Sequence, residues 1–290
     1  MPELVAGLID VFAETPLSGN PLAIVERAEV LSEEQMRRIA GEFNQAETTF
    51  ILPSDRADWR LRSFTANGSE VFGAGHNALG AWLWLAEQEK LGAWEGARTF
   101  LQEMGSGILP IDLERVDGRF HGRLKQAPMR MLPPPADMSA IATALGLAMA
   151  DIVDSPAARP VSTGAAHLLV HLHDRAAVDR ASPEHERLAA LLSQAGAEGC
   201  YIYALGEPPI ERAYARAFSP TVGLWEDSAT GTAAGPLAAY LAREGLLRGD
   251  AFTIEQGVKM GRRSVLKITL KPDPVLSGAG IITLLGVLRI

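Results

Sequence analysis

Two segments of the chain are apolar on nearly every side of the helix that each would form. They cover residues 78–86 and 236–242, and each follows a strand-like segment and a run of small residues. A helix that is apolar on all sides is buried in the protein interior. The amides of its first turn then face the interior and favour a bound anion. The pattern predicts two buried helix starts, one in each half, at a site between two similar domains.

The order of the other elements also repeats. An amphipathic helix followed by a strand is predicted in each half, at residues 32–40 and 47–52 and again at 183–192 and 200–205. Phe50 then aligns with Ile202, and Arg62 aligns with Arg216. The number of residues that separates the two members is nearly the same in both pairs. Agreement of several segments in one order indicates duplication of a half-length unit.

Several predicted strands are short and separated by turns, which favours mixed sheets with a few helices over a regular alternation of strand and helix. A buried helix in each half then indicates a sheet that wraps around it. The domain boundary is predicted in the proline-rich segment 126–135, because consecutive prolines form a stiff extended connector. We therefore expect domains at 1–127 and 128–290, with the last strand, about 280–290, free to pack on the first half.

Composition and charge exclude several classes of protein. The 290 residues are 47% hydrophobic and 21% charged, as in soluble globular proteins. A net charge of −8 argues against nucleic acid as a partner, and no apolar run reaches the roughly 18–20 residues of a membrane helix. The sequence begins without a basic segment of the secretory type, and its one cysteine cannot form an internal disulfide. A cytoplasmic enzyme or binding protein is expected, with no nucleic-acid or membrane partner.

Glu47 is the first candidate for chemistry. It lies where the predicted helix gives way to the strand and is followed by β-branched and aromatic residues. A carboxylate at the rim of a core loses hydration, which raises its pKa toward a range useful for proton transfer. The alternative interpretation is an ordinary solvated loop glutamate.

His76 is the second candidate, at the start of the first apolar helix. It follows Gly75 and precedes Asn77, so the imidazole would lie beside an amide-lined anion site. The positive end of the helix dipole favours the neutral form of this ring. The alternative is a capping or core histidine without a role in catalysis.

The second half has its own counterpart at residues 226–232. Asp227 is predicted either to cap the second apolar helix or to contact the ligand, and Gly231 and Thr232 fall at the start of that helix. Thr232 offers both a hydroxyl and a backbone amide.

Residues 73–78 also match the G-x-G-x-x-G/A dinucleotide fingerprint, with Glu103 near the place of the ribose-binding acid. This match makes an NAD(P)-dependent oxidoreductase the second hypothesis. Against it, the preceding strand is interrupted at 67–69, and the second half lacks the fingerprint. A third hypothesis is a non-catalytic small-acid-binding protein, which would keep both helix starts without proton exchange.

Metal and thiol chemistry are weaker alternatives. His167, His171 and His173 have even spacing and would share one strand face, but no Cys, Asp or Glu with ligand spacing joins them. A strand face of mixed polarity is expected, with no metal. Cys200 is interpreted as a buried structural residue.

Taken together, these motifs resemble the phenazine-biosynthesis PhzF-like isomerase family. The motifs occur in family order over nearly the whole chain, at 10–12, 18–23, 47–50, 62–65, 75–76 and 226–233. The resemblance implies an α+β fold of the diaminopimelate-epimerase type. Such a fold has two pseudo-symmetric domains, each a curled mixed sheet around a central buried helix, with the site in a cleft between them.

The resemblance also implies roles for residues. Glu47 matches the general acid/base of the family, and His76 and Asp227 match its other catalytic groups. Gly75, Gly231 and the helix-start residues beside them would bind a small carboxylate-bearing substrate. The family implies a homodimer and an isomerase that needs no cofactor. Paired cysteines of the related racemases are absent at both helix starts, so a proton shift by a single base is favoured.

The sequence departs from the family pattern at two places within the predicted pocket. Asn77 stands where proline or alanine is more usual, with an apparent extra residue before His76, and Thr232 replaces the more common serine. The resemblance therefore supports the assignment of the acid/base residues more strongly than it supports any particular substrate.

Overall fold

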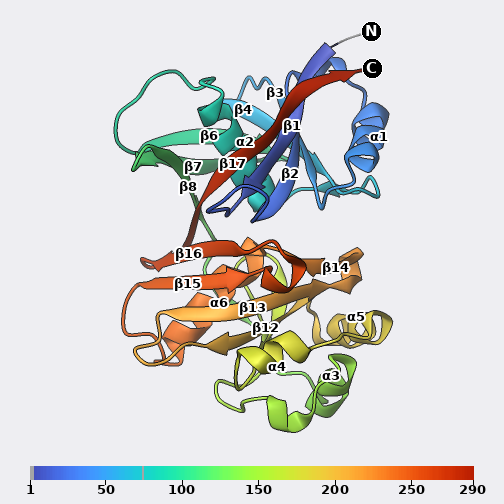
Figure 1. Cartoon of the computed structure of the whole chain (residues 1–290), viewed down its shortest axis with the longest axis vertical. Coiled ribbons are helices and arrows are strands. Elements are labelled where there is room, and N and C mark those ends of the chain that lie inside the picture. Colours follow the sequence, from blue (N-terminus) through green and yellow to red (C-terminus); the bar gives the residue numbers. More distant parts are fainter. Residues whose placement is uncertain (1–2, 74) are drawn as a thin grey trace. The chain divides into compact units, whose positions relative to one another are not determined.

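The computed structural model describes residues 3–73 and 75–290, which divide into two units. Unit 1 comprises Met1–Lys125 and Ser277–Ile290, and unit 2 comprises Gln126–Leu276. Each unit combines a mixed sheet with helices (Figure 1). This confirms the α+β class that the short strands and helical segments predict.

Unit 1 is built on a sheet that closes on itself. Its strands are β1 (Glu3–Val11), β2 (Asn20–Val25), β3 (Thr48–Leu52), β4 (Trp59–Phe64), β5 (Glu70–Val71), β6 (Arg98–Met104), β7 (Gly107–Val116), β8 (Arg119–Lys125) and β17 (Pro274–Arg289). Successive pairings run from β17 through β1, β2, β3, β4, β6, β7 and β8 and return to β17. The helix α2 (His76–Glu87) contacts six of these strands and therefore lies inside the closed sheet.

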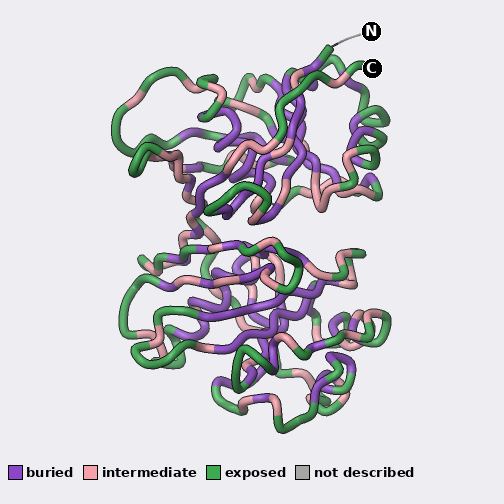
Figure 2. The backbone as a smooth tube through the Cα atoms, viewed as in Figure 1, coloured by how far each residue is buried: buried purple, intermediate pink, exposed green. Residues whose placement is uncertain are grey.

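The central helix α2 is buried on all sides. All of its residues except the first and the last are buried (Figure 2), which confirms the buried helix predicted at 78–86. Its two indole N–H groups find acceptors within the sheet. Trp82 Nε1 donates to Gln102 Oε1 at 3.0 Å, and Trp84 Nε1 donates to Glu26 Oε1 at 2.8 Å. The helix can therefore be buried without an unsatisfied indole donor.

The amphipathic helix α1 (Glu33–Phe43) packs on β3 and β4. Ser32 and Gln35 form a capping box, in which each side chain accepts a hydrogen bond from the backbone amide of the other. The helix ends at Phe43, and its C-cap residue, Asn44, adopts the left-handed conformation at φ 50°. The helix predicted at 32–40 is confirmed, with Ser32 as its N-cap.

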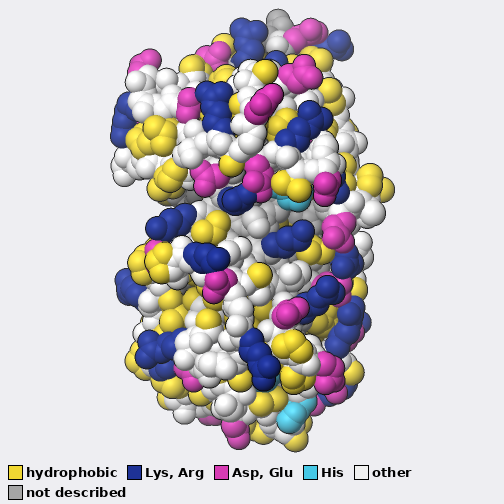
Figure 3. Space-filling model, turned by 90° about the vertical axis from the view of Figure 1, so that its left-hand side faces the viewer, with side chains coloured by type: hydrophobic (Ala, Val, Ile, Leu, Met, Phe, Trp, Pro, Cys, Tyr) yellow, Lys and Arg dark blue, Asp and Glu magenta, His cyan; other side chains and the backbone are white. Residues whose placement is uncertain are grey.

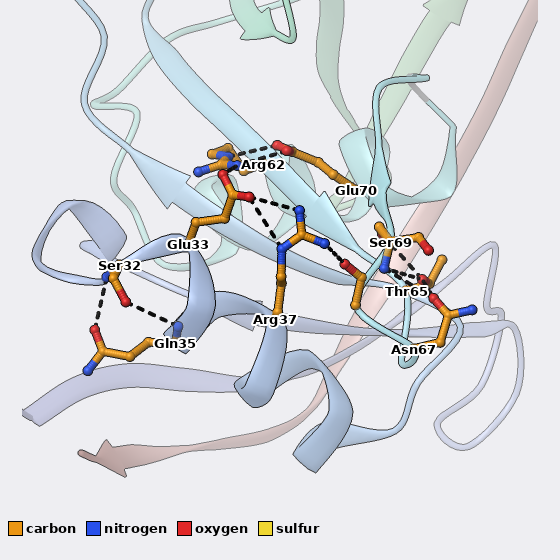
Figure 4. Close-up of polar contacts among 10 residues, drawn as sticks. Ser32, Glu33, Gln35, Arg37, Arg62, Thr65, Asn67, Ser69 and Glu70 are labelled. Atoms are coloured by element: carbon orange, nitrogen blue, oxygen red, sulfur yellow. Dashed lines mark hydrogen bonds and ion pairs between the residues drawn. The ribbon is translucent and has the colours of Figure 1, made fainter.

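Four charged residues tie α1 to β4 and β5 (Figure 4). Arg62 of β4 makes a two-pronged contact with Glu70 of β5, at 2.7 and 2.8 Å, and reaches Glu33 of α1 at 2.7 Å. Arg37 donates to the same Glu33 at 2.8 Å. The network therefore holds α1, β4 and β5 together through side-chain contacts.

Unit 2 contains a second mixed sheet and four helices. Its strands are β9 (Arg130–Met131), β10 (Arg159–Ser162), β11 (Ala166–His171), β12 (Gly199–Leu205), β13 (Arg212–Ser219), β14 (Leu224–Asp227), β15 (Ala251–Gln256) and β16 (Ser264–Leu270). Its helices are α3 (Met138–Ala144), α4 (Arg175–Arg180), α5 (His185–Ala195) and α6 (Gly231–Arg243). The mostly buried α6 contacts β10, β11 and β16, whereas α4 contacts β12 and β13. Helix α6 covers the apolar segment predicted at 236–242.

The strand pairings of the two units follow the same order. In unit 1, β2–β3 is parallel, β3–β4 and β4–β5 are antiparallel, β4–β6 is parallel and β6–β7 is antiparallel. In unit 2, the same sequence of pairings joins β11, β12, β13, β14, β15 and β16. The registers place Phe50 opposite Arg62 and Ile202 opposite Arg216, which are the residues that the sequence alignment equates.

The last strand, β17, begins at Pro274 in unit 2, and its later residues pair with β1 in unit 1. The division into folding domains at 1–127 and 128–290 stays a prediction, since packing within the chain does not say which part folds alone. Within residues 3–73 and 75–290, every helix is too short or too polar to cross a lipid bilayer.

Candidate active site

Glu47 lies between Asn44, the C-cap of α1, and Thr48, the first residue of β3. The parallel pairing of Thr48 with Ala23 of β2 fixes the backbone immediately after the glutamate. Its side chain is 18% exposed, so the carboxylate is largely withdrawn from water. Because α2 packs against β2 and β3, Glu47 is held beside the first turn of that buried helix.

Asn77 organises the start of α2. Its Oδ1 accepts hydrogen bonds from the amides of Gly75 at 2.7 Å and Ala78 at 2.9 Å, and its Nδ2 donates to the carbonyl of Gly73 at 3.0 Å. The side chain is buried and closes the glycine-rich loop. Its predicted contact with the substrate would therefore be made through its backbone amide, which, like that of His76, belongs to the first turn of α2.

Glu47 and His76 face each other across a short gap. Glu47 Oε2 lies 3.8 Å from His76 Nδ1, and the imidazole is 11% exposed. Burial lowers the pKa of His76 from its ordinary value near 6.5 to about 4. The contact at neutral pH is therefore between a carboxyl group and a neutral imidazole. The buried Nε2 of His76 makes no hydrogen bond within residues 3–73 and 75–290, so it can bond to a ligand.

Asp227 belongs to a buried polar chain in unit 2. Its Oδ2 accepts from Thr230 Oγ1 at 2.7 Å, and its backbone carbonyl accepts from Gln256 Nε2 at 2.7 Å. Tyr201 OH donates to Gln256 Oε1 at 2.7 Å. Burial, with a further contribution from the charge of Asp227, raises the pKa of Tyr201 well above its ordinary value, so the phenol stays a donor. Thr230 occupies the N-cap position of α6, and Asp227 is joined to it through the hydroxyl of Thr230.

The first residues of α6 are Gly231 and Thr232. A Cβ on Gly231 would collide with Cδ2 of the buried Leu276, so any larger residue at this position would force that side chain to move. Thr232 Oγ1 lies 3.0 Å from Nε2 of the buried His167. Burial lowers the pKa of His167 to about 4, so its ring is neutral and orients the threonine hydroxyl by a hydrogen bond.

The lowered pKa of His167 predicts a pH-dependent stability. In the unfolded chain the ring titrates near pH 6.5, so that state binds the extra proton first and the folded state is destabilised as the pH falls toward 4. Between pH 7.5 and 4.5 this histidine should lower the unfolding free energy by about 2–3 kcal/mol. His76 has the same lowered pKa and should add a similar loss.

We expect His167→Gln to remove about half of the loss that these two histidines cause between pH 7.5 and 4.5. Glutamine keeps a hydrogen bond to Thr232 but does not titrate. Urea unfolding at the two pH values measures the effect. An exposed control, His173→Gln, should leave the loss unchanged. Equal pH dependence in wild type and His167→Gln would contradict the prediction.

The residues considered for metal or thiol chemistry lie outside the two groups described above. His171 stacks on Tyr203 with ring centroids 5.0 Å apart, and His173 lies beyond the end of β11. Cys200 is buried, and burial raises the pKa of its thiol. Within the described part of the chain, no three His, Cys, Asp or Glu side chains are grouped so that they could hold a metal ion.

The structure around residues 73–78 argues against a dinucleotide-binding site there. Only the two-residue strand Glu70–Val71 precedes it, and its Ala74 lies outside the described residues. Glu103 accepts hydrogen bonds from Ser54 at 2.6 Å and from Arg56 at 3.4 Å. The acid proposed for a ribose is therefore already bound within unit 1.

The structure thus brings Glu47 and His76 together in unit 1, and gathers Asp227, Gly231 and Thr232 at the start of α6 in unit 2. The sequence did not indicate that three further residues, His167, Tyr201 and Gln256, support the second group. Only the even spacing of the histidines drew attention to His167, and it pointed to a different role.

Comparison with known proteins gives a consistent result. The model of the family described as phenazine biosynthesis-like protein, PhzC-PhzF, matches residues 9–280. A trans-2,3-dihydro-3-hydroxyanthranilate isomerase from Pseudomonas aeruginosa is 36% identical over 263 residues, covering 89% of this chain and 87% of that protein. The uncharacterized isomerase YddE from Salmonella typhimurium is 32% identical over 286 residues, covering 94% of each protein.

Solved structures show the same relationship. A Bacillus anthracis phenazine biosynthesis protein of the PhzF family has a TM-score of 0.89 and 26% identity, with 100% of both chains covered. A hydroxyproline epimerase from Agrobacterium vitis has a TM-score of 0.68 and 13% identity, covering 99% of this chain and 91% of that chain. The second likeness concerns the fold alone.

Proposed function

The chain belongs to the phenazine biosynthesis-like protein family and is an isomerase of the PhzF type, and from this premise we propose that it moves a proton within a small, carboxylate-bearing metabolite. The relative from Pseudomonas aeruginosa is named for a cyclic amino acid, trans-2,3-dihydro-3-hydroxyanthranilate. A substrate of that general kind, a ring or amino acid with a carboxylate, fits two helix starts that offer amide donors.

The observation that carries the proposal is the pairing of Glu47 with His76. A carboxyl group withdrawn from water lies 3.8 Å from a neutral imidazole at the start of a buried helix. In the proposed step, Glu47 takes a proton from one carbon of the substrate and returns it to another on the same face. The neutral His76 orients the substrate through Nε2 or shares the proton, and no cofactor is required.

Unit 2 contributes the remaining groups in this proposal. Asp227 and the hydroxyl of Thr232 contact polar groups of the same substrate, and the amides of Gly231 and Thr232 bind its carboxylate. The chain of hydrogen bonds through Thr230 and the His167–Thr232 contact support these groups by restricting their orientation. Location of the site in a cleft between the halves remains part of the proposal.

We also infer that the two units arose by duplication and are pseudo-symmetric. The repeated order of strand pairing supports this inference, as does a second feature of β4 and β13. Arg62 pairs with Glu70 and lies over the ring of Phe64, and Arg216 pairs in the same way with Glu226 and lies over Phe218. Homodimer formation and a cytoplasmic location are predictions that rest on the family resemblance and on the sequence.

Solvent-proton exchange tests the proposed function. The enzyme is incubated in D₂O with trans-2,3-dihydro-3-hydroxyanthranilate and with a pool of small cyclic acids and amino acids, and deuterium uptake is followed by mass spectrometry. We expect uptake into at least one acid, because a proton held by a carboxyl group exchanges with solvent between removal and return. A compound that stabilises the protein against heat but takes up no deuterium would favour the acid-binding alternative.

A further inference from the structure

A groove on unit 2 contains none of the residues assigned to proton transfer. It is formed by the adjoining ends of β12, β13, β15 and β16 and by the start of α4, and its volume is about 320 Å³. That volume accommodates a small organic molecule. The polar side chains of its lining include Arg175, Arg212, Arg263, Glu255, Tyr214 and Thr253.

The charges in this lining do not balance. Glu255 is its one carboxylate, and it accepts hydrogen bonds from Arg175 at 2.9 Å and from Arg263 at 2.6 Å. The third guanidinium, on Arg212, has no hydrogen-bond or ion-pair partner within residues 3–73 and 75–290. Over the face of the molecule in Figure 3, by contrast, basic and acidic side chains are interspersed. The lining therefore holds three guanidinium groups and a single carboxylate.

Two of the groups in the groove are held in place before any ligand binds. The guanidinium of Arg175 lies over the ring of Tyr214, with its Cζ 4.0 Å from the ring centroid. The ring itself is fixed by a hydrogen bond from Tyr214 OH to Asp179 Oδ1 at 2.6 Å. Stacking and the contact with Glu255 leave other N–H groups of Arg175 available, and a pre-oriented guanidinium loses little conformational entropy when it binds an anion.

The corresponding part of unit 1 lacks this surplus of guanidinium groups, because one arginine stands at the equivalent positions beside two carboxylates. Arg60 is opposite Glu103 in β4 and β6, as Tyr214 is opposite Glu255 in β13 and β15. Two residues before Arg60 stands an aspartate, Asp58, whereas Arg212 stands two residues before Tyr214. The excess of positive charge is therefore specific to unit 2, and the shared pattern of strand pairing does not require it.

We propose that this groove binds a small dianion, either a phosphate monoester or a dicarboxylate. Arg212 provides the uncompensated guanidinium, and Arg175 provides the second donor. Guanidinium groups bind both phosphate and carboxylate through paired, charge-assisted hydrogen bonds, so both ligand types share this chemistry. The site is independent of the proposed proton transfer, because it uses other residues.

Calorimetric titration of the intact protein tests the groove, with inorganic phosphate and succinate as probes at constant ionic strength. We expect saturable binding of at least one probe, and a roughly tenfold loss of affinity in Arg212→Gln, as for one charge-assisted hydrogen bond. Glu255→Gln should tighten binding, since it removes the competing carboxylate. Arg248→Gln makes the same change of charge at an exposed position of unit 2 outside the lining and should bind as wild type does.

The two probes distinguish the sources of the dianion, because binding of phosphate alone identifies a phosphate monoester and binding of succinate alone identifies a dicarboxylate. If succinate instead binds at the start of α2 or α6, the Arg212→Gln variant and the wild-type protein will have equal affinity for it. That result would overturn the proposal, as would the absence of saturable binding of either probe. Neither outcome depends on whether the proton-exchange assay succeeds.

Discussion

Replacing Glu47 with glutamine should lower the rate of proton exchange at least about 10³-fold and leave substrate affinity within about threefold of wild type. Glutamine has nearly the same size and still forms hydrogen bonds, but it cannot take up and return a proton. The carboxylate is 18% exposed and lies beside a neutral His76, so the substitution changes few contacts with solvent. Deuterium uptake measures the rate, and calorimetry of the same variant measures the affinity.

Glu42→Gln serves as the matched control, because Glu42 is an exposed residue near the end of α1 in the same unit. It should exchange protons at the wild-type rate. Retention of more than a tenth of the wild-type rate by Glu47→Gln would exclude this glutamate as the general acid/base. Loss of both exchange and affinity would instead assign it to binding alone.

The largest effect on stability is expected for Arg216→Met. The side chain of Arg216 is 8% exposed and makes a two-pronged contact with Glu226, at 2.8 and 2.9 Å. It also donates to the carbonyls of Val178 and Ala181 at 3.0 and 2.8 Å. Removing it leaves a partly buried carboxylate and two carbonyls without their donor. Breaking such a buried pair should cost about 3–5 kcal/mol of unfolding free energy.

Arg62→Met provides the comparison within the same molecule. Arg62 holds the equivalent position in β4 but is 16% exposed, and its side-chain partners are the carboxylates of Glu70 and Glu33, of which Glu33 faces water. Water can replace these contacts more easily, so a loss of about 1 kcal/mol is expected. Urea unfolding followed by circular dichroism measures both variants. Equal losses would show that the backbone carbonyls bound by Arg216 contribute little.

Elements that depend on local chemistry were predictable from the sequence. The capping box of Ser32 and Gln35 and the continuous apolar pattern of α2 act over one or a few helical turns, so the residues that determine them are close in the chain. The alignment of Phe50 with Ile202 and of Arg62 with Arg216 likewise agrees with the strand registers. The positions of Glu47 and His76 at element boundaries, and the family, followed from the same information.

The tertiary structure alone decided which side chains meet. His167 and Thr232 lie 65 residues apart, and Tyr201 and Gln256 lie 55 apart. Their contacts depend on strand register and on the rotation of α6 against the sheet, which the packing of the whole core determines. Asn77 shows the same limit: the sequence places it in the pocket, but its side chain closes its own loop. The sequence by itself therefore determined the elements and the groups available for chemistry, and long-range packing decided how those groups are oriented.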